Sequence, residues 1–171
     1  RQIRINRARP MYDPIHQAMS YFIAILIGTL EIGPHMAKKY WLVKQEPEAY
    51  SWDQFVSDGV ADWSGVRNYQ ARNHLRSMKK GDHVLYYHSV TGKCVMGIAE
   101  VVKEHYPDTT AEKGDWSAVD ISPIKPLKKS VTLAQIKEDP ELSEIALIRQ
   151  SRLSVMPLTS AEFKRIVKLG N

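Results

Sequence analysis

Short apolar runs separated by polar turns make up most of the chain after residue 38. KYWLVK at 39–44 is aromatic and β-branched and is stopped by QEPE, which predicts a strand that enters a polar loop. HVLYYH at 83–88 and CVMGIAEVVK at 94–103 flank the turn SVTGK, and together they predict the clearest hairpin of the chain. The second of these strands is apolar on both faces, as expected in a closed or covered sheet.

Two more strands are predicted later in the sequence. WSAVDISPIKPL at 116–127 predicts a strand that its prolines end, and RLSVMPLT at 152–159 predicts a final strand. Within HVLYYH, Tyr86 and Tyr87 must face opposite ways because successive strand residues alternate. At most one of these two tyrosines can therefore join a pocket.

Helical patterns lie between the strands. Residues 51–58 begin with serine three positions before glutamine, a capping box that predicts a short helix. Residues 69–80 carry apolar side chains at i, i+4 and i+7 and are followed by glycine, which predicts an amphipathic helix. Residues 132–150 predict one or two short helices, and a second capping box predicts a closing helix at 160–170.

Short strands interleaved with short helices are typical of an α+β domain. We expect about five or six strands in a mixed β sheet that curls into a small pseudo-barrel, with short helices packed around it. The strands are too short and the helical patterns too irregular for a doubly wound sheet.

Composition narrows the class of protein without naming a function. With 171 residues, 43% hydrophobic and 25% charged, the chain suits one globular domain. A net charge of +5 weakly favours an anionic partner. The single cysteine cannot form an internal disulfide, so we expect a reducing, cytoplasmic setting.

Residues 1–35 differ from the rest of the sequence. They contain four arginines and the apolar run YFIAILIG, which is too short to span a bilayer. No small-residue cleavage site of a signal peptide follows the run in a suitable place. We expect Met36 to be the natural start, residues 1–35 to be a poorly ordered upstream or cloning-derived extension, and residues 36–171 to form the domain.

Catalytic motifs are not found in the sequence. It has no G-x-S-x-G, no H-E-x-x-H, no Walker lysine loop, and no pair of Cys or His at metal spacing. His88 and Ser89 are adjacent in a predicted strand and point to opposite faces, so they make a poor base and nucleophile pair. Cys94 fits a small buried role, and nothing singles out Glu46 or Asp82 as an acid or base. We therefore expect no catalytic residue, no metal and no cofactor.

The segment DWSGVRNYQARN at 62–73 favours a nucleic-acid partner. Unpaired nucleotides are held by aromatic faces that stack on bases, by amides that read base edges and by basic groups on the backbone. Here Trp63 offers an aromatic plane and Gly65 permits close backbone approach, while Arg67 and Arg72 can meet phosphates. Three amides can read a base edge: Asn68, Gln70 and Asn73.

Burial expectations follow from the neighbours of each tryptophan. Trp41, Trp52 and Trp116 lie in apolar or regular contexts, so we expect core or edge packing. Trp63 lies between Asp62 and Ser64, so we expect it to be accessible. On composition and spacing alone, nucleic-acid binding and a generic interaction domain are equal alternatives.

Several ordered blocks resemble the EVE domain family. The blocks are YWLVKQEPEAYSWDQF, WSGVRNYQARNHLRSMKKGD, YYHS, HYPD, WSAVDI and LIRQSRLSVMPLT, and they cover about residues 38–169. The resemblance implies a fold like that of PUA and YTH domains and a nucleic-acid ligand, DNA or RNA, with a modified cytosine or adenine turned into a pocket.

The resemblance also implies which residues line that pocket. They come from four segments: Lys44, Gln45 and Glu46; Trp63, Gly65, Val66, Arg67 and Asn68; His88 and Ser89; and Arg152, Leu153 and Ser154. The family usually has serine at the position of Gln45, and it often has a longer segment where this chain has TTAEKGD. Both differences bear on ligand identity more than on fold.

The sequence therefore predicts a noncatalytic, monomeric reader of a modified base that contacts no membrane and no metal. Trp63 is expected to stack on the base, and Asn68 and Ser89 to contact its edge. The phosphates are expected to meet Arg67, Arg72 and Arg152. Two alternatives stay open: an enzyme that uses Glu46 or His88 as general acid or base, and a protein-interaction domain with a basic helix.

Overall fold

The computed structural model describes residues 38–171. The predictions about residues 1–35 and about Met36 lie outside the described residues. Within the described part, one mixed six-stranded sheet has the order β2-β5-β4-β3-β1-β6. Its strands are β1 (Tyr40–Gln45), β2 (Ala61–Asp62), β3 (His83–His88), β4 (Cys94–Pro107), β5 (Ser117–Thr132) and β6 (Val155–Leu158).

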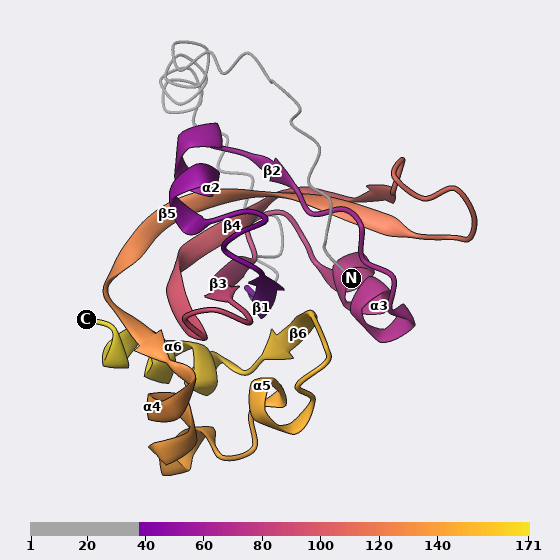
Figure 1. The fold of residues 1–171 in the computed structure, drawn as a ribbon. Helices are drawn as coiled ribbons and strands as arrows, with labels where there is room; N and C mark the ends of the chain where they lie inside the picture. The colour runs from indigo at the N-terminus through magenta and orange to yellow at the C-terminus, as the bar shows by residue number, and fades with distance from the viewer. Residues whose placement is uncertain (1–37) are drawn as a thin grey trace, which may run out of the picture. The chain divides into compact units, whose positions relative to one another are not determined.

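The sheet curls because its two longest strands bend along their length (Figure 1). β1 is parallel to β3 and antiparallel to β6, while β3, β4 and β5 form an antiparallel meander. The register of β4 shifts once against β3 and four times against β5. Such breaks in register, of which β-bulges are the usual kind, bend and twist a strand, so the sheet curls toward a barrel. The predicted α+β, PUA-like fold is confirmed.

The prediction that prolines end the strand after Trp116 is wrong. β5 continues through Pro123 and Pro126 to Thr132. Proline lacks the N–H that a ladder needs, yet both residues lie where the register to β4 shifts. On the other side, β2 pairs only with Asp120 and Ile121, so no strand in the described part needs those N–H groups.

Short helices fill the connections, as the sequence predicts. They are α2 (Trp52–Asp58), α3 (Tyr69–Ser77), α4 (Leu133–Glu138), the 3₁₀ turn η1 (Pro140–Leu142), α5 (Ala146–Arg149) and α6 (Ser160–Leu169). Ser51 caps α2 by accepting from the backbone N–H of Gln54. Thr159 and Glu162 form the full reciprocal box at α6. None of the described helices is long and apolar enough to cross a membrane.

An aromatic cluster forms the part of the core between α2 and the sheet. Phe55 stacks on Tyr86 with ring centroids 5.2 Å apart, and Trp52 packs edge-on against Tyr86 at 5.5 Å. Gly97 in β4 makes room for Trp52, because a Cβ on Gly97 would lie 2.3 Å from the indole. This close approach packs α2 tightly against the sheet at β4.

Candidate functional site

Four segments meet at one edge of the sheet. β1 and β3 are parallel, so their carboxyl ends lie together and bring residues 44–46 beside Ser89. The N–H of Ser89 donates to the carbonyl of Gln45 at 2.8 Å. The segment before β6 joins this edge because the N–H of Lys44 donates to the carbonyl of Ser154 at 2.9 Å. The start of α3 supplies the fourth wall.

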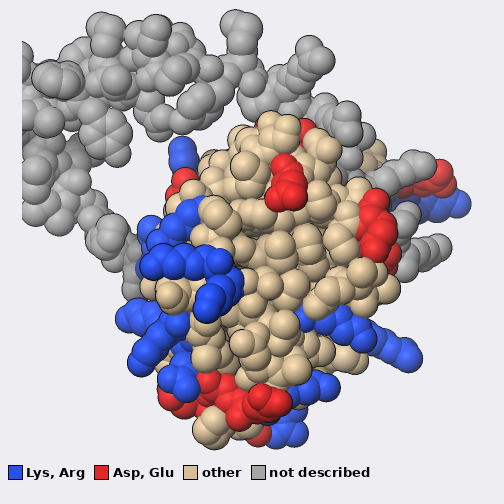
Figure 2. Space-filling view, turned by 60° about the vertical axis from the view of Figure 1, so that its left-hand side comes forward, with Lys and Arg blue, Asp and Glu red and all other residues tan. Residues whose placement is uncertain are grey.

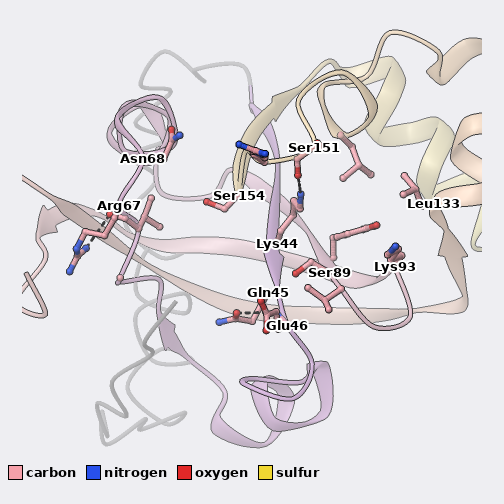
Figure 3. Close-up of a pocket in the computed structure, with 16 residues that line it drawn as sticks. Lys44, Gln45, Glu46, Arg67, Asn68, Ser89, Lys93, Leu133, Ser151 and Ser154 are labelled. Atoms are coloured by element: carbon pink, nitrogen blue, oxygen red, sulfur yellow. Dashed lines mark hydrogen bonds between the residues drawn. The ribbon is translucent and has the colours of Figure 1, made fainter. Parts of the chain in front are cut away.

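A cavity of about 690 Å³ opens between these segments (Figure 3). Three of its lining residues lie at the end of β1: Lys44, Gln45 and Glu46. Residues 65–68 line it from the loop before α3, and Ser89 lines it from the end of β3. Arg152 and Ser154 line it from the segment before β6. These predicted site residues are thus brought together around one cavity.

Lys44 is oriented by the backbone on the far side of the cavity. Its Nζ donates to the carbonyl oxygen of Ser151 at 2.5 Å, and burial lowers the pKa of its ammonium group. Figure 3 shows Lys44 reaching toward Ser151, with Ser154 on one side and Ser89 on the other. The hydroxyl groups of Ser89 and Ser154 have no hydrogen-bond partner among the described residues. They can therefore donate to or accept from a ligand.

The side-chain amide oxygen of Asn68 has a structural role at the start of α3. As the N-cap of α3, its Oδ1 accepts from the N–H of Ala71 at 2.9 Å. Asn68 also lines the cavity, and its Nδ2 group is able to donate to a carbonyl oxygen or ring nitrogen. On the opposite wall, Glu46 is an acceptor for an amino group.

Sequence reasoning missed six lining residues: Tyr87, Val90, Lys93, Leu133, Leu147 and Ser151. Both tyrosines of the Tyr86–Tyr87 pair are buried, and of the two only Tyr87 borders the cavity. Burial raises the pKa of the Tyr87 phenol to about 12, with a smaller contribution from Cys94, so the group stays a neutral hydroxyl. The alternation of side chains along β3 predicted that one of the two tyrosines could reach a pocket. Leu133 and Leu147 carry no signal in the sequence beyond being apolar.

Arg67 lines the cavity but is held by an acid. Its Nη1 donates to Asp108 Oδ2 at 2.6 Å, and its Nη2 donates to the hydroxyl of Thr110 at 3.0 Å. In Figure 3 the guanidinium points away from Ser154 and Lys44. Burial raises the pKa of Asp108, but hydrogen bonds from Thr110, Arg67 and Gly65 together outweigh it, so the pKa lies below its usual value. Arg67 therefore stabilises the wall of the cavity by joining it to Asp108 and Thr110.

The expectation that Trp63 is accessible is wrong. The side chain is fully buried and does not line the cavity. The backbone N–H of Trp63 donates to the carbonyl of Val119 at 2.7 Å. The indole packs edge-on against Tyr86, and its buried Nε1 has no hydrogen-bond partner among the described residues. The polar neighbours Asp62 and Ser64 misled the prediction, because pairing of β2 with β5 draws this segment into the core. Trp116, for which we expected core or edge packing, is partly exposed and packs against Tyr69.

Three further predicted residues lie elsewhere than the cavity wall. His88 is buried, and its Nε2 accepts from the N–H of Trp52 at 3.0 Å, so it positions α2. Leu153 is buried and borders a smaller hollow of about 310 Å³ beside Arg152. Arg72 donates to the carbonyl of Asp115 at 2.9 Å and stands outside the cavity.

The charges around the cavity favour an anion. Four basic side chains line it, from Lys44, Arg67, Lys93 and Arg152. Arg67 is paired with Asp108, so three basic groups remain against the single lining acid Glu46. Arg152 and Lys93 have no acidic partner among the described residues. On the face seen in Figure 2, basic side chains gather at the left, and acidic ones lie at the lower edge, at the right and near the top. In the described part, no group of three or more His, Cys, Asp or Glu side chains is arranged to hold a metal ion.

Comparison with known families agrees with this architecture. The family model described as the EVE domain matches residues 39–169. The chain belongs to the EVE domain family. Thymocyte nuclear protein 1 of Mus musculus is 34% identical over 175 residues, which cover 82% of this chain and 77% of that protein.

Solved structures of other EVE domains superpose on the described fold. A protein of Rhodopseudomonas palustris, solved by NMR, is 49% identical with a TM-score of 0.74, covering 77% of this chain and 92% of that one. Human THYN1 in complex with DNA that contains 5-methylcytosine is 32% identical with a TM-score of 0.74, covering 78% of this chain and 98% of that one. The predicted family is confirmed.

Proposed function

We propose that this protein is a noncatalytic reader that binds DNA carrying a modified cytosine and holds the modified base in the cavity. The observation that carries the proposal is the cavity itself, with convergent polar groups on a positively charged rim. Its volume of about 690 Å³ lies in the range of small-molecule sites. The complex of the human relative with 5-methylcytosine DNA supports this ligand class.

The polar groups of the cavity match the edge of a cytosine. Glu46 accepts from the exocyclic amino group, and the Nδ2 of Asn68 donates to the ring nitrogen or carbonyl oxygen. Ser89 and Ser154 complete the edge contacts. A base held this way must leave the duplex stack, which costs a few kcal/mol that these contacts offset.

Part of the cavity wall is apolar, although Trp63 does not contribute to it. Tyr87, Val66 and Leu147 border the cavity as buried side chains and make part of its wall apolar. A methyl group on the base gains by leaving water against such a wall, at roughly 25 cal/mol per Å² of apolar surface buried. This term separates methylated from unmethylated cytosine.

A binding screen tests the proposal. Oligonucleotides of one sequence differ only in one base: cytosine, 5-methylcytosine, adenine or N6-methyladenine, each as DNA and RNA. We expect tightest binding to DNA with 5-methylcytosine, and Glu46→Gln should weaken that complex while Lys164→Ala on α6 should not. Equal affinity across the panel contradicts a modified-base reader.

The same samples separate binding from catalysis. Under the proposal, the mass of the oligonucleotide is unchanged after prolonged incubation with the protein. A changed mass would make the protein an enzyme, with Glu46 as the acid or base because His88 does not line the cavity.

A further inference from the structure

Beside the cavity, two aromatic side chains form a stack on the surface. Tyr69, the first residue of α3, lies face to face with Trp116 at a centroid distance of 5.0 Å and an interplanar angle of 21°. Tyr69 is 68% exposed, more than any other large hydrophobic residue of the described part. A tyrosine that stacks and yet keeps this exposure presents one of its ring faces to solvent.

Two arginines border the stack without covering its open face. The guanidinium of Arg72 lies 5.0 Å from the Tyr69 centroid and 5.9 Å from the Trp116 centroid. A group on the outer face of Tyr69 would lie much farther from Trp116 than Tyr69 does. Arg72 therefore flanks the pair, and Arg67 lies over the Trp116 ring at 5.6 Å.

The stack is held rigid by its surroundings. The indole Nε1 of Trp116 donates to the carbonyl of Lys113 at 3.1 Å. Gly114 allows this approach, because a Cβ there would lie 2.7 Å from the same Nε1. Arg72 is fixed by its bond to the carbonyl of Asp115. A rigid aromatic surface loses little side-chain entropy when a partner stacks on it.

The stack is continuous with the cavity. Arg67 contributes to both, since it lines the cavity and lies over Trp116, and Tyr69 directly follows the cavity residue Asn68. The surrounding charge is positive, because three arginines at positions 67, 72 and 76 face only two acids, Asp108 and Asp115. A flat aromatic face with guanidinium groups at its margin suits a nucleobase joined to a phosphate.

We propose that the open face of Tyr69, backed by Trp116, is a second base-binding subsite that stacks on the nucleotide next to the base in the cavity. This inference rests on the proposed function, which places a modified base of DNA in the cavity. The subsite adds affinity for the strand without selecting its sequence, because every base has an aromatic face. The cavity reads the modification, and the Tyr69 face holds the neighbouring nucleotide in place.

Affinities of Tyr69→Ala and Tyr69→Phe for the 5-methylcytosine oligonucleotide test this subsite. Loss of one stacked base predicts about 5- to 150-fold weaker binding for Tyr69→Ala. Tyr69→Phe keeps the ring and should bind as the parent protein does. Val56→Ala, at another exposed apolar residue on α2, is the matched control and should also leave affinity unchanged.

An abasic neighbour gives an independent readout. An abasic site directly 5′ or 3′ of the modified base should weaken binding by the parent protein on one of these sides, and should add little to the loss in Tyr69→Ala. Free 5-methyl-2′-deoxycytidine has no neighbour, so Tyr69→Ala should bind it normally. An equal loss for the free nucleoside would mean that Tyr69 shapes the cavity, and would overturn the subsite.

Two other outcomes separate a failure of the subsite from a failure of the proposed function. Unchanged oligonucleotide affinity in a folded Tyr69→Ala protein overturns the subsite and leaves this face to a protein partner. If the parent protein binds oligonucleotides without preferring a modified base, the proposed function fails, yet the Tyr69→Ala comparison with unmodified DNA still tests stacking. The two failures are therefore distinguishable.

Discussion

Asp108 Oδ2 accepts two hydrogen bonds at once, from Arg67 Nη1 at 2.6 Å and from the backbone N–H of Gly65 at 2.8 Å. Its Oδ1 accepts from the backbone N–H and the hydroxyl of Thr110 at 2.8 and 2.6 Å. One buried carboxylate thereby joins its own loop to residues 65–67, which form a wall of the cavity. The Arg67 guanidinium, which was predicted to meet a phosphate, is paired with Asp108 in this structure.

Asp108→Asn should destabilise the fold and weaken ligand binding together. The amide places N–H donors against the donors of Arg67 or Thr110 and leaves the Arg67 charge unpaired. We expect a loss of about 3 kcal/mol in the free energy of unfolding. This is the lower end of the usual cost of breaking a buried ion pair, because the Arg67 side chain is 25% exposed. Urea unfolding measures it. Asp115→Asn, at an exposed partner of Arg76, is the control, and an equal effect of the two changes would contradict the buried role.

Stability should fall in mildly acidic solution because of His88. Burial lowers the pKa of His88, and nearby Asp53 and Glu48 oppose this only in part. Nε2 must stay unprotonated to accept from the N–H of Trp52. Below about pH 6.5, the ordinary pKa of histidine, His88 takes up a proton in the unfolded chain but stays neutral in the folded protein. The contribution is present above pH 6.5 and is lost as the pH falls toward the lower folded pKa.

His88→Gln separates this contribution from those of other histidines. The amide oxygen of glutamine can still accept from Trp52 but does not titrate, so the fall in unfolding free energy between pH 7.5 and 5 should be shallower. Burial also lowers the pKa values of His74 and His83, so part of the slope will remain. A slope identical to that of the parent protein would mean that His88 is not the group involved.

Gly97→Ala should be destabilising through contact with Trp52. The new Cβ would lie 2.3 Å from the indole, which is buried and packed against Phe55 and Tyr86. We expect a loss of about 1 to 3 kcal/mol in urea unfolding, as for other overpacked cores. In a Trp52→Phe background the smaller ring leaves space, so the same change should cost less. If Gly97→Ala costs the same unfolding free energy in both backgrounds, the strain does not come from contact with Trp52.

Arg152→Ala should reduce the salt dependence of DNA binding. Arg152 is exposed at the rim of the cavity and has no acidic partner in the described part of the chain. If it neutralises one phosphate, the slope of log affinity against log salt should fall by about 0.7 on a single strand or 0.9 on a duplex. Fluorescence anisotropy over a salt series measures the slope. The same fall with Lys164→Ala, on α6, would show that only the overall charge matters.

Local patterns in the sequence determined the elements of this domain. The hairpin of β3 and β4, the closing helix and its capping box depend on residues two to four positions apart, so the chain specifies them directly. The ordered blocks around GVRNYQARN likewise indicated the family and the segments that meet at the cavity.

Only the tertiary structure decided which side chains those segments turn inward. Trp63 is in the core, although its polar neighbours in sequence suggested an accessible side chain, and Trp116 is partly exposed. Arg67 is committed to Asp108, 41 residues away, and His88 to Trp52, 36 residues away. Burial and pairing are set by the packing of distant strands and loops, and a pattern read along one segment carries no information about what will be packed against it.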